Sequence, residues 1–199
     1  MESRNMEWKE TWRDEYLKTI CAFANAGGGV LEIGRDDGGK AVGLDNVKKL
    51  LEDLPNKIRN AMGVIADIEL KETDGKQYIV VGVKPYTFPI SCRGKYYYRS
   101  GSTTQELSGG SLDEFILRRQ GKTWDGVPAP YVKLDDFESD AFKFFRRRAI
   151  GSARLTTDDL DISDEILLEN LMLTEGDYIK RAAVLLFHQN PKNGFLARM

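Results

Sequence analysis

Apolar residues in the first part of the chain recur first with a helical period and then in strand-like runs. Over residues 9–25 they return every three or four positions, which predicts a helix with one buried face, ended by consecutive glycines. Strand-like runs at 30–34 and 41–43 flank an Asp- and Gly-rich stretch that is typical of a tight turn. Asp45 is a suitable N-cap for a second helix, which we expect to end near residue 60.

The rest of the chain continues to mix strands and helices. We expect strands at 64–70, 77–83 and 95–99, and helices at 112–119, 138–150, 163–171 and 179–187. Asp74-Gly75 between the first two of these strands is a strong signal for a hairpin. Ser111, with Glu114 three positions later, predicts the start of the helix that follows.

Composition argues against several classes of protein. The 199 residues are 41% hydrophobic, enough for an ordinary globular core. No apolar run is long enough to span a membrane and the charged N-terminus is no secretory signal, so we expect a cytoplasmic protein. The one histidine, His188, argues against Ser-His-Asp catalysis and histidine-rich metal sites. Cys21 and Cys92 lie far apart and are expected to be reduced, small apolar residues.

Charge is unevenly distributed, although the net charge is only -2. Residues 84–122 carry 7 basic and 3 acidic side chains, which is either a phosphate-binding surface or a solvated face. Within this segment, three tyrosines and Arg99 precede the hydroxyl-rich turn 100–104. Guanidinium, hydroxyl and aromatic groups together suit a nucleic-acid backbone. The same spacing also fits a strand with alternate tyrosines in the core, followed by an ordinary turn.

Three carboxylates form a candidate metal site, Glu2, Glu7 and Asp37. Phosphodiester cleavage assisted by a divalent metal needs two or three such groups to converge. Surface charge and turn formation explain the same residues without a metal.

Several motifs resemble the Schlafen AlbA-like domain. Residues 2–9, ESRNMEWK, resemble its ESxxxEFK opening; residues 22–43 resemble its AFANxxGGxLxIGVDDxGxVxG signature; and residues 97–104 resemble its YxRxGSS motif. The resemblance covers about residues 1–122. Residues 117–125 and 180–187 further resemble RecG-like transcriptional regulators of bacteria.

The resemblance implies an α+β domain at residues 1–122, with a mixed or antiparallel sheet and packed helices. A linker is expected at 123–137, and residues 138–199 are expected to be a mainly helical fragment of a following, incomplete domain. The implied role is DNA binding in transcriptional regulation, with RNA as another possible ligand and a homodimer as a possible assembly. No cofactor is expected for this role.

Under this binding hypothesis, a basic patch and the hydroxyl turn contact phosphates. The residues expected to do so are Arg93, Lys95, Arg99, Ser100, Ser102, Thr103, Arg118, Arg119 and Lys122.

Two alternatives remain open. In vertebrate Schlafen proteins, positions matching Glu2, Glu7 and Asp37 form a metal-dependent RNA-cleaving site, which implies an endoribonuclease that uses Mg²⁺ or Mn²⁺ on structured RNA. Arg35 stands where the family has valine, and its charge offsets the acidic turn. The third hypothesis is a module for dimerisation or protein contact, with the basic segment as solvated surface.

Overall fold

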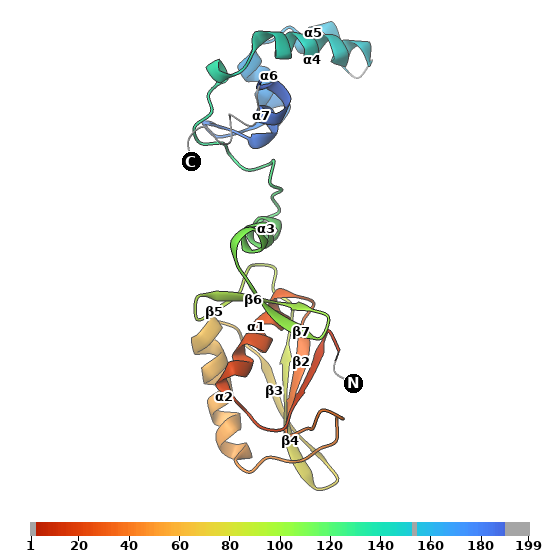
Figure 1. Ribbon diagram of the computed structural model, residues 1–199, viewed down its shortest axis with the longest axis vertical. Coiled ribbons are helices and arrows are strands. Elements are labelled where there is room, and N and C mark those ends of the chain that lie inside the picture. Colours follow the sequence, from red (N-terminus) through yellow and green to blue (C-terminus); the bar gives the residue numbers. More distant parts are fainter. Residues whose placement is uncertain (1–2, 153–154, 190–199) are drawn as a thin grey trace. The chain divides into compact units, whose positions relative to one another are not determined.

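The computed structural model describes residues 3–152 and 155–189. The chain divides into two compact units, Met1–Gln120 and Gly121–Met199, and each is described by itself (Figure 1).

A four-stranded mixed sheet forms the centre of the first unit. Its strands are β1 (Met6–Lys9), β2 (Gly29–Ile33), β3 (Asp67–Thr73) and β4 (Lys76–Val83), in the order β1-β2-β4-β3. β1 runs parallel to β2, and the other neighbours are antiparallel. β3 and β4 are joined at Asp74-Gly75, so the predicted hairpin is confirmed.

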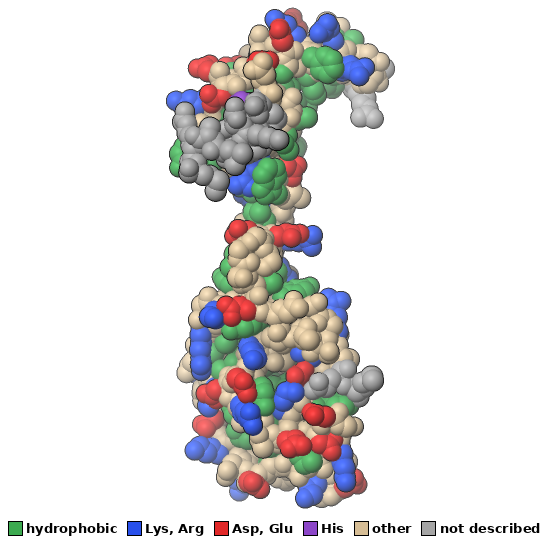
Figure 2. All heavy atoms as spheres, viewed as in Figure 1, with side chains coloured by type: hydrophobic (Ala, Val, Ile, Leu, Met, Phe, Trp, Pro, Cys, Tyr) green, Lys and Arg blue, Asp and Glu red, His purple; other side chains and the backbone are tan. Residues whose placement is uncertain are grey.

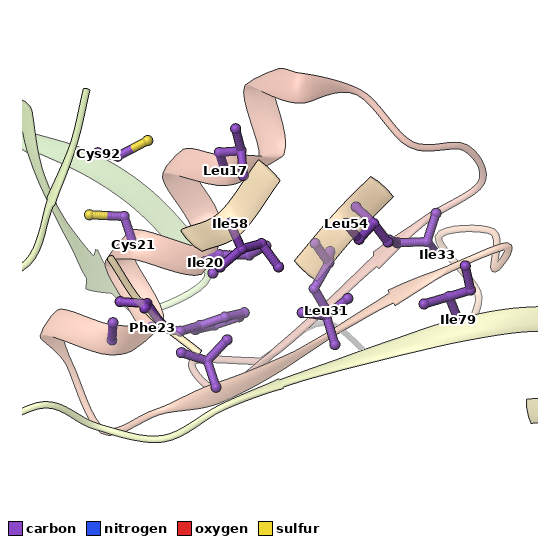
Figure 3. Close-up of a cluster of buried hydrophobic side chains, with 14 of the residues drawn as sticks. Leu17, Ile20, Cys21, Phe23, Leu31, Ile33, Leu54, Ile58, Ile79 and Cys92 are labelled. Atoms are coloured by element: carbon purple, nitrogen blue, oxygen red, sulfur yellow. The ribbon is translucent and has the colours of Figure 1, made fainter. Parts of the chain in front are cut away.

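Two helices provide the other half of the core. α1 (Leu17–Asn25) and α2 (Val47–Met62) place Ile20, Leu54 and Ile58 against Leu31 and Ile79 of the sheet (Figure 3). All five side chains are fully buried. The apolar side chains that recur every three or four positions thus line the helix faces that meet the sheet.

A second, three-stranded antiparallel sheet packs on α1. It consists of β5 (Ser91–Cys92), β6 (Lys95–Ser100) and β7 (Thr103–Leu107), and α3 (Gly109–Arg119) follows it. Ser108 is the N-cap of α3, and Ser111 lies at the third helical position, where its hydroxyl accepts from the Ser108 amide at 3.3 Å. The prediction of Ser111 as the cap was therefore wrong by three residues, because this serine closes the capping box from inside the helix.

Further local predictions also differ from the structure, and the N-cap of α2 is Asn46 rather than the predicted Asp45. The helix expected at 9–25 begins only after the 3₁₀ turn η1 (Asp14–Tyr16), because Lys9 pairs with β2 as part of β1. The strand expected at 41–43 is reduced to one bridge, Arg35 to Ala41. β7 was missed because its polar residues read as part of a turn, whereas backbone pairing with β6 makes them a strand.

The second unit contains short helices around an aromatic core. Its elements are η2 (Leu134–Asp136), α4 (Ser139–Gly151), α5 (Thr157–Leu160), α6 (Asp164–Asn170), the strands β8 (Thr174–Glu175) and β9 (Tyr178–Ile179), and α7 (Arg181–Phe187). Phe142 and Phe187 stack with centroids 4.3 Å apart. Within the described parts of the chain, no helix is long and apolar enough to cross a membrane.

Asn25, at the end of α1, joins three segments of the first unit. Its side chain is fully buried, accepts from the Ile90 amide at 2.8 Å, and donates to the carbonyls of Ile90 at 2.7 Å and Tyr97 at 2.9 Å. Peptide groups before β5 and inside β6 are thereby paired with a helix end. A buried amide side chain with all of these partners fixes the second sheet against α1.

Replacing Asn25 with Ala should destabilise the first unit by roughly 3 kcal/mol, because buried peptide groups lose their partners. The free energy of unfolding is measured by urea titration. Asn56→Ala is the control, since the Asn56 side chain is exposed and its one bond to a carbonyl lies within α2. We expect the control to change stability by no more than about 0.5 kcal/mol. Equal effects of the two substitutions would contradict this role of Asn25.

The two buried thiols should be unreactive in the folded protein. Burial raises the pKa of Cys21 to about 12, and its thiol donates to the Ile90 carbonyl at 3.3 Å. Burial also raises the pKa of Cys92 above its ordinary value. Iodoacetamide at pH 8 should label both cysteines only after unfolding, as measured by mass spectrometry. Rapid labelling of native Cys21 would contradict the assignment.

Alkaline pH should also weaken the fold through Cys21. The unfolded thiol ionises near its ordinary pKa of 9.0, whereas the folded thiol stays protonated up to about 12. Stability contributed by the protonated thiol is therefore fully present below pH 9 and is lost as the pH rises towards 12. Urea titrations at pH 8 and pH 10.5 should show this loss, and Cys21→Ala should reduce the difference between them.

Candidate nucleic-acid interface

Strand β6 presents different chemistry on its two faces. Tyr97 packs against the core and Arg99 is 1% exposed, so these side chains face α1. Alternation along a strand directs Tyr96, Tyr98 and Ser100 to the opposite face. Their partners across the ladder on β7 are Leu107, Gln105 and Thr103. The outward face of this small sheet therefore carries two aromatic rings beside hydroxyl and amide groups.

Arg99 is a structural residue of the interior. Its guanidinium forms an ion pair with Glu7 at 2.5 Å and donates to the Ser3 carbonyl at 3.3 Å and to the Thr104 hydroxyl at 3.2 Å. It also lies 5.2 Å from the centroid of the Phe23 ring. The prediction that Arg99 contacts phosphate directly is therefore corrected, because its charge is already neutralised inside the protein. Sequence reasoning missed this, since Glu7 is 92 positions away.

The turn between β6 and β7 is exposed and carries hydroxyl groups. Ser100, Ser102 and Thr103 are all exposed. Thr103 donates its hydroxyl to the Ser100 carbonyl at 2.8 Å, which closes the turn, and Gly101 supplies the positive φ of 59° that the turn requires. The Ser100 and Ser102 side chains lie at the surface, where hydroxyl groups suit phosphate oxygens.

The exposed cations of the predicted patch each lie beside a carboxylate. The pairs are Arg93 with Asp14 at 3.9 Å, Lys95 with Glu106 at 3.0 Å, and Arg118 with Glu114 at 2.7 Å. Figure 2 shows acidic and basic side chains interspersed over the visible surface of the first unit. Ion pairs this exposed are worth at most about 1 kcal/mol, so a phosphate can displace the carboxylates.

The pKa values of Lys95 and Asp14 show how these ion pairs affect the charges of their members. Hydrogen bonding to Glu106 raises the pKa of Lys95, and hydrogen bonds from Lys57 and Trp12 lower the pKa of Asp14. Both shifts favour the charged forms. Lys95 and Asp14 are therefore both charged near neutral pH, and the surface around them is mixed in sign.

The last two predicted cations have other partners. Arg119 is half-buried, donates to the carbonyls of Tyr86 and Asn25, and lies 5.3 Å from the Phe115 ring centroid. It anchors α3 to the body of the first unit. Lys122 belongs to the second unit, where it pairs with Glu175 at 2.7 Å.

The candidate metal ligands are placed as follows. Glu2 lies outside the described residues. Glu7 is held by Arg99 and by Lys9 at 2.8 Å, and Asp37 is exposed on a turn. Glu7 and its neighbour Trp8 point to opposite faces of β1, and Gly39 of the Asp37 turn approaches the Trp8 ring so closely that a Cβ would come within 2.8 Å of it. Among the described residues, no three acidic, histidine or cysteine side chains form a possible metal-binding group.

Arg35 braces the turn that carries Asp37. It pairs with Glu32 at 2.6 Å, donates to the Gly39 carbonyl, and stacks on the Tyr78 ring at 4.1 Å. Its charge is thus directed to Glu32 rather than to Asp37. This bracing was not predicted, because Glu32 was read only as a strand residue.

A groove lies between the outward face of the small sheet and α3. Its volume is about 500 Å³ and it is lined by Tyr98, Leu107, Ser111, Glu114, Phe115, Arg118 and Arg119. The Tyr98 and Phe115 rings meet edge to face with centroids 6.0 Å apart. The sequence predicted the two arginines as ligand contacts but not Phe115 or Glu114, because the helical period alone does not reveal what a helix face meets.

Comparison with known protein families finds one family model that matches the chain. The family model described as Schlafen, AlbA_2 matches residues 2–108, more than half of the sequence. No curated protein matches the sequence significantly.

Two solved structures are similar at low identity. The DIP2311 protein from Corynebacterium diphtheriae is 20% identical, with a TM-score of 0.48, and the match covers 92% of this chain and 40% of that one. The N-terminal domain of a RecG-related protein from Nitrosomonas europaea is 28% identical, with a TM-score of 0.36, over 43% of this chain and 65% of that one. The chain therefore spans less than two thirds of either structure.

Glu7→Gln should destabilise the first unit by about 3–5 kcal/mol, because it leaves the Arg99 charge buried without a counter-charge. Urea titration followed by tyrosine and tryptophan fluorescence measures the change. Glu106→Gln is the matched control, since its ion pair with Lys95 is exposed and worth less than about 1 kcal/mol. If the two variants unfold at the same urea concentration, the buried pair lacks the structural role assigned to it.

Proposed function

The chain belongs to the Schlafen AlbA_2 family, and we propose that its first unit binds nucleic acid through the outward face of the β5–β6–β7 sheet and the Ser100–Thr103 turn. The family is nucleic-acid-associated. One observation carries the proposal for this chain. Burial of Arg99 and Tyr97 against α1 leaves the aromatic and hydroxyl side chains of the small sheet directed outward.

Phosphate contacts are also expected beyond the outward face, at both ends of β6, because Lys95 alternates with Tyr97 and Arg99 and lies on the side of α1 where the strand begins. Arg93 and Lys95 are 66% and 60% exposed in their side chains at one end, and the hydroxyl turn lies at the other. A strand of 6 residues spans about 20 Å, which is the length of roughly six base pairs. Residues at the two ends of β6 can therefore contact phosphates within the same stretch of a DNA duplex.

The expected ligand is DNA, and the wider role is in a bacterial transcriptional regulator. Contacts to phosphate supply affinity and register but no choice of sequence. A recognition element elsewhere, or deformation of the DNA, would then supply specificity. RNA is the other nucleic acid that the same backbone contacts suit.

The nuclease hypothesis requires a change in the contacts of Glu7. Cleavage of structured RNA with Mg²⁺ or Mn²⁺ requires Glu7 to exchange Arg99 and Lys9 for a metal ion. Because removal of Glu7 would leave the Arg99 charge buried and unpaired, this exchange is costly. The binding function needs no such rearrangement.

The double variant Arg93→Glu/Lys95→Glu should weaken binding of a labelled DNA duplex at least tenfold. If each cation neutralises one phosphate, the slope of log K against log salt should fall by about 1.8, since each duplex phosphate contact contributes about 0.9. Fluorescence anisotropy at four salt concentrations measures both quantities. The loss should be the same for duplexes of different sequence.

Lys71→Glu/Lys76→Glu is the matched control, because it makes the same change in net charge on the β3–β4 hairpin, where both lysines are exposed. Affinity and slope should stay close to those of the unmodified protein. If this control loses as much affinity as the first variant, the effect is one of overall charge and the interface lies elsewhere.

A further inference from the structure

We propose that the groove between the small sheet and α3 holds one unpaired nucleobase, so that the first unit prefers single-stranded or locally opened nucleic acid to a closed duplex. This inference rests on the proposed function, because the base enters the groove from a strand whose phosphates are bound at the ends of the same small sheet. It adds a binding site for a base to an interface for the backbone.

The floor of the groove is aromatic and apolar. Tyr98 from β6, Leu107 from β7 and Phe115 from α3 line the groove and are each half-buried, so part of each side chain is accessible to a ligand. In an edge-to-face pair the ring that presents its edge does not have its faces covered by its partner ring, so the contact of Tyr98 with Phe115 is compatible with a further stacking partner. Every nucleobase offers a flat π-face to such a ring.

The size of the groove is compatible with a single base. The groove volume of about 500 Å³ falls within the usual range for small-molecule sites, roughly 300–1,000 Å³. It accommodates one nucleotide. A base in a closed duplex is paired and stacked between its neighbours, so it must leave the helix before it can stack on a protein ring.

The rim of the groove suits the polar parts of a nucleotide. Arg118 is 77% exposed in its side chain and reaches solvent beside the groove, where it can pair with a phosphate. Its present partner, Glu114, is then free to accept hydrogen bonds from the base. A carboxylate at this place favours cytosine, whose amino group donates, and guanine, which presents donors on its pairing edge.

The anchoring of α3 keeps the groove open. Arg119 donates to two carbonyls of the body, those of Tyr86 and Asn25, while its guanidinium also lies against Phe115. The helix is thus fixed at its C-terminal end and its Phe115 ring is held at the sheet. The Phe115 ring meets Tyr98 edge to face rather than lying flat on it.

The experiment uses the full chain and a single-stranded DNA 12-mer of thymines with one central 2-aminopurine, a fluorescent base whose emission falls on stacking. We expect saturating protein to quench this emission about twofold or more. A strand of twelve abasic deoxyribose phosphates has the same backbone but no base to insert, and it should bind at least about fivefold more weakly in competition. A duplex of the same length should also compete less well.

Two variants locate the effect. Phe115→Leu keeps an apolar side chain against the sheet but removes the ring, and it should abolish the quenching and weaken binding of the 12-mer about tenfold. Phe88→Leu is the control, because Phe88 is an exposed aromatic residue of the first unit that does not line the groove. The control should bind and quench like the unmodified protein.

The possible outcomes separate the inference from the proposed function. If the abasic strand binds as tightly as the 12-mer and 2-aminopurine is not quenched, the inference is wrong, while binding of the backbone stands. The same conclusion follows if Phe115→Leu and Phe88→Leu behave alike. If no strand and no duplex binds at micromolar protein and low salt, the proposed function and the inference both fail. The comparison with the abasic strand uses the unmodified protein. A folding defect in Phe115→Leu therefore does not prevent the test.

Discussion

A guanidinium removed from water must find a counter-charge and partners for its N–H groups, and this requirement organises the first unit. Arg99 meets most of this requirement through Glu7 of β1, the Ser3 carbonyl and the Thr104 hydroxyl of β7, and only its Nε has no hydrogen-bond partner among the described residues. Segments from the two ends of the domain therefore converge on one side chain. Because an unpaired buried charge is costly, the small sheet has few alternative arrangements against the large one.

The inward direction of Arg99 also decides what the surface presents. Neighbouring residues on a strand alternate between faces, so fixing Arg99 inside places Tyr98 and Ser100 outside. Asn25 adds a second constraint by pairing with peptide groups on both sides of β5. The chemistry available for a ligand is thus a consequence of two polar side chains that never reach the solvent.

The sequence predicted the local helices and strands better than the contacts between residues that are far apart in the chain. The β3–β4 hairpin and most helices followed from periodicity and turn residues, since these are properties of neighbouring positions. The burial of Arg99 could not be predicted, because a charged residue reads as exposed until its distant partner is known. The groove depends on the meeting of Tyr98 with Phe115, which only the packing of α3 determines. The family motifs marked the right segments, but not which of their residues face inward.

The Asn25 hydrogen bonds have a consequence for how tightly a partner can be held. They join a helix end, the segment before β5 and the middle of β6 into one rigid piece, so the surface beside them has its shape before any ligand arrives. A preorganised surface loses little conformational entropy on association, and more of the contact energy then remains as affinity. The ordering cost falls on the flexible partner, and a strand that is already unpaired would adapt to the protein rather than the reverse.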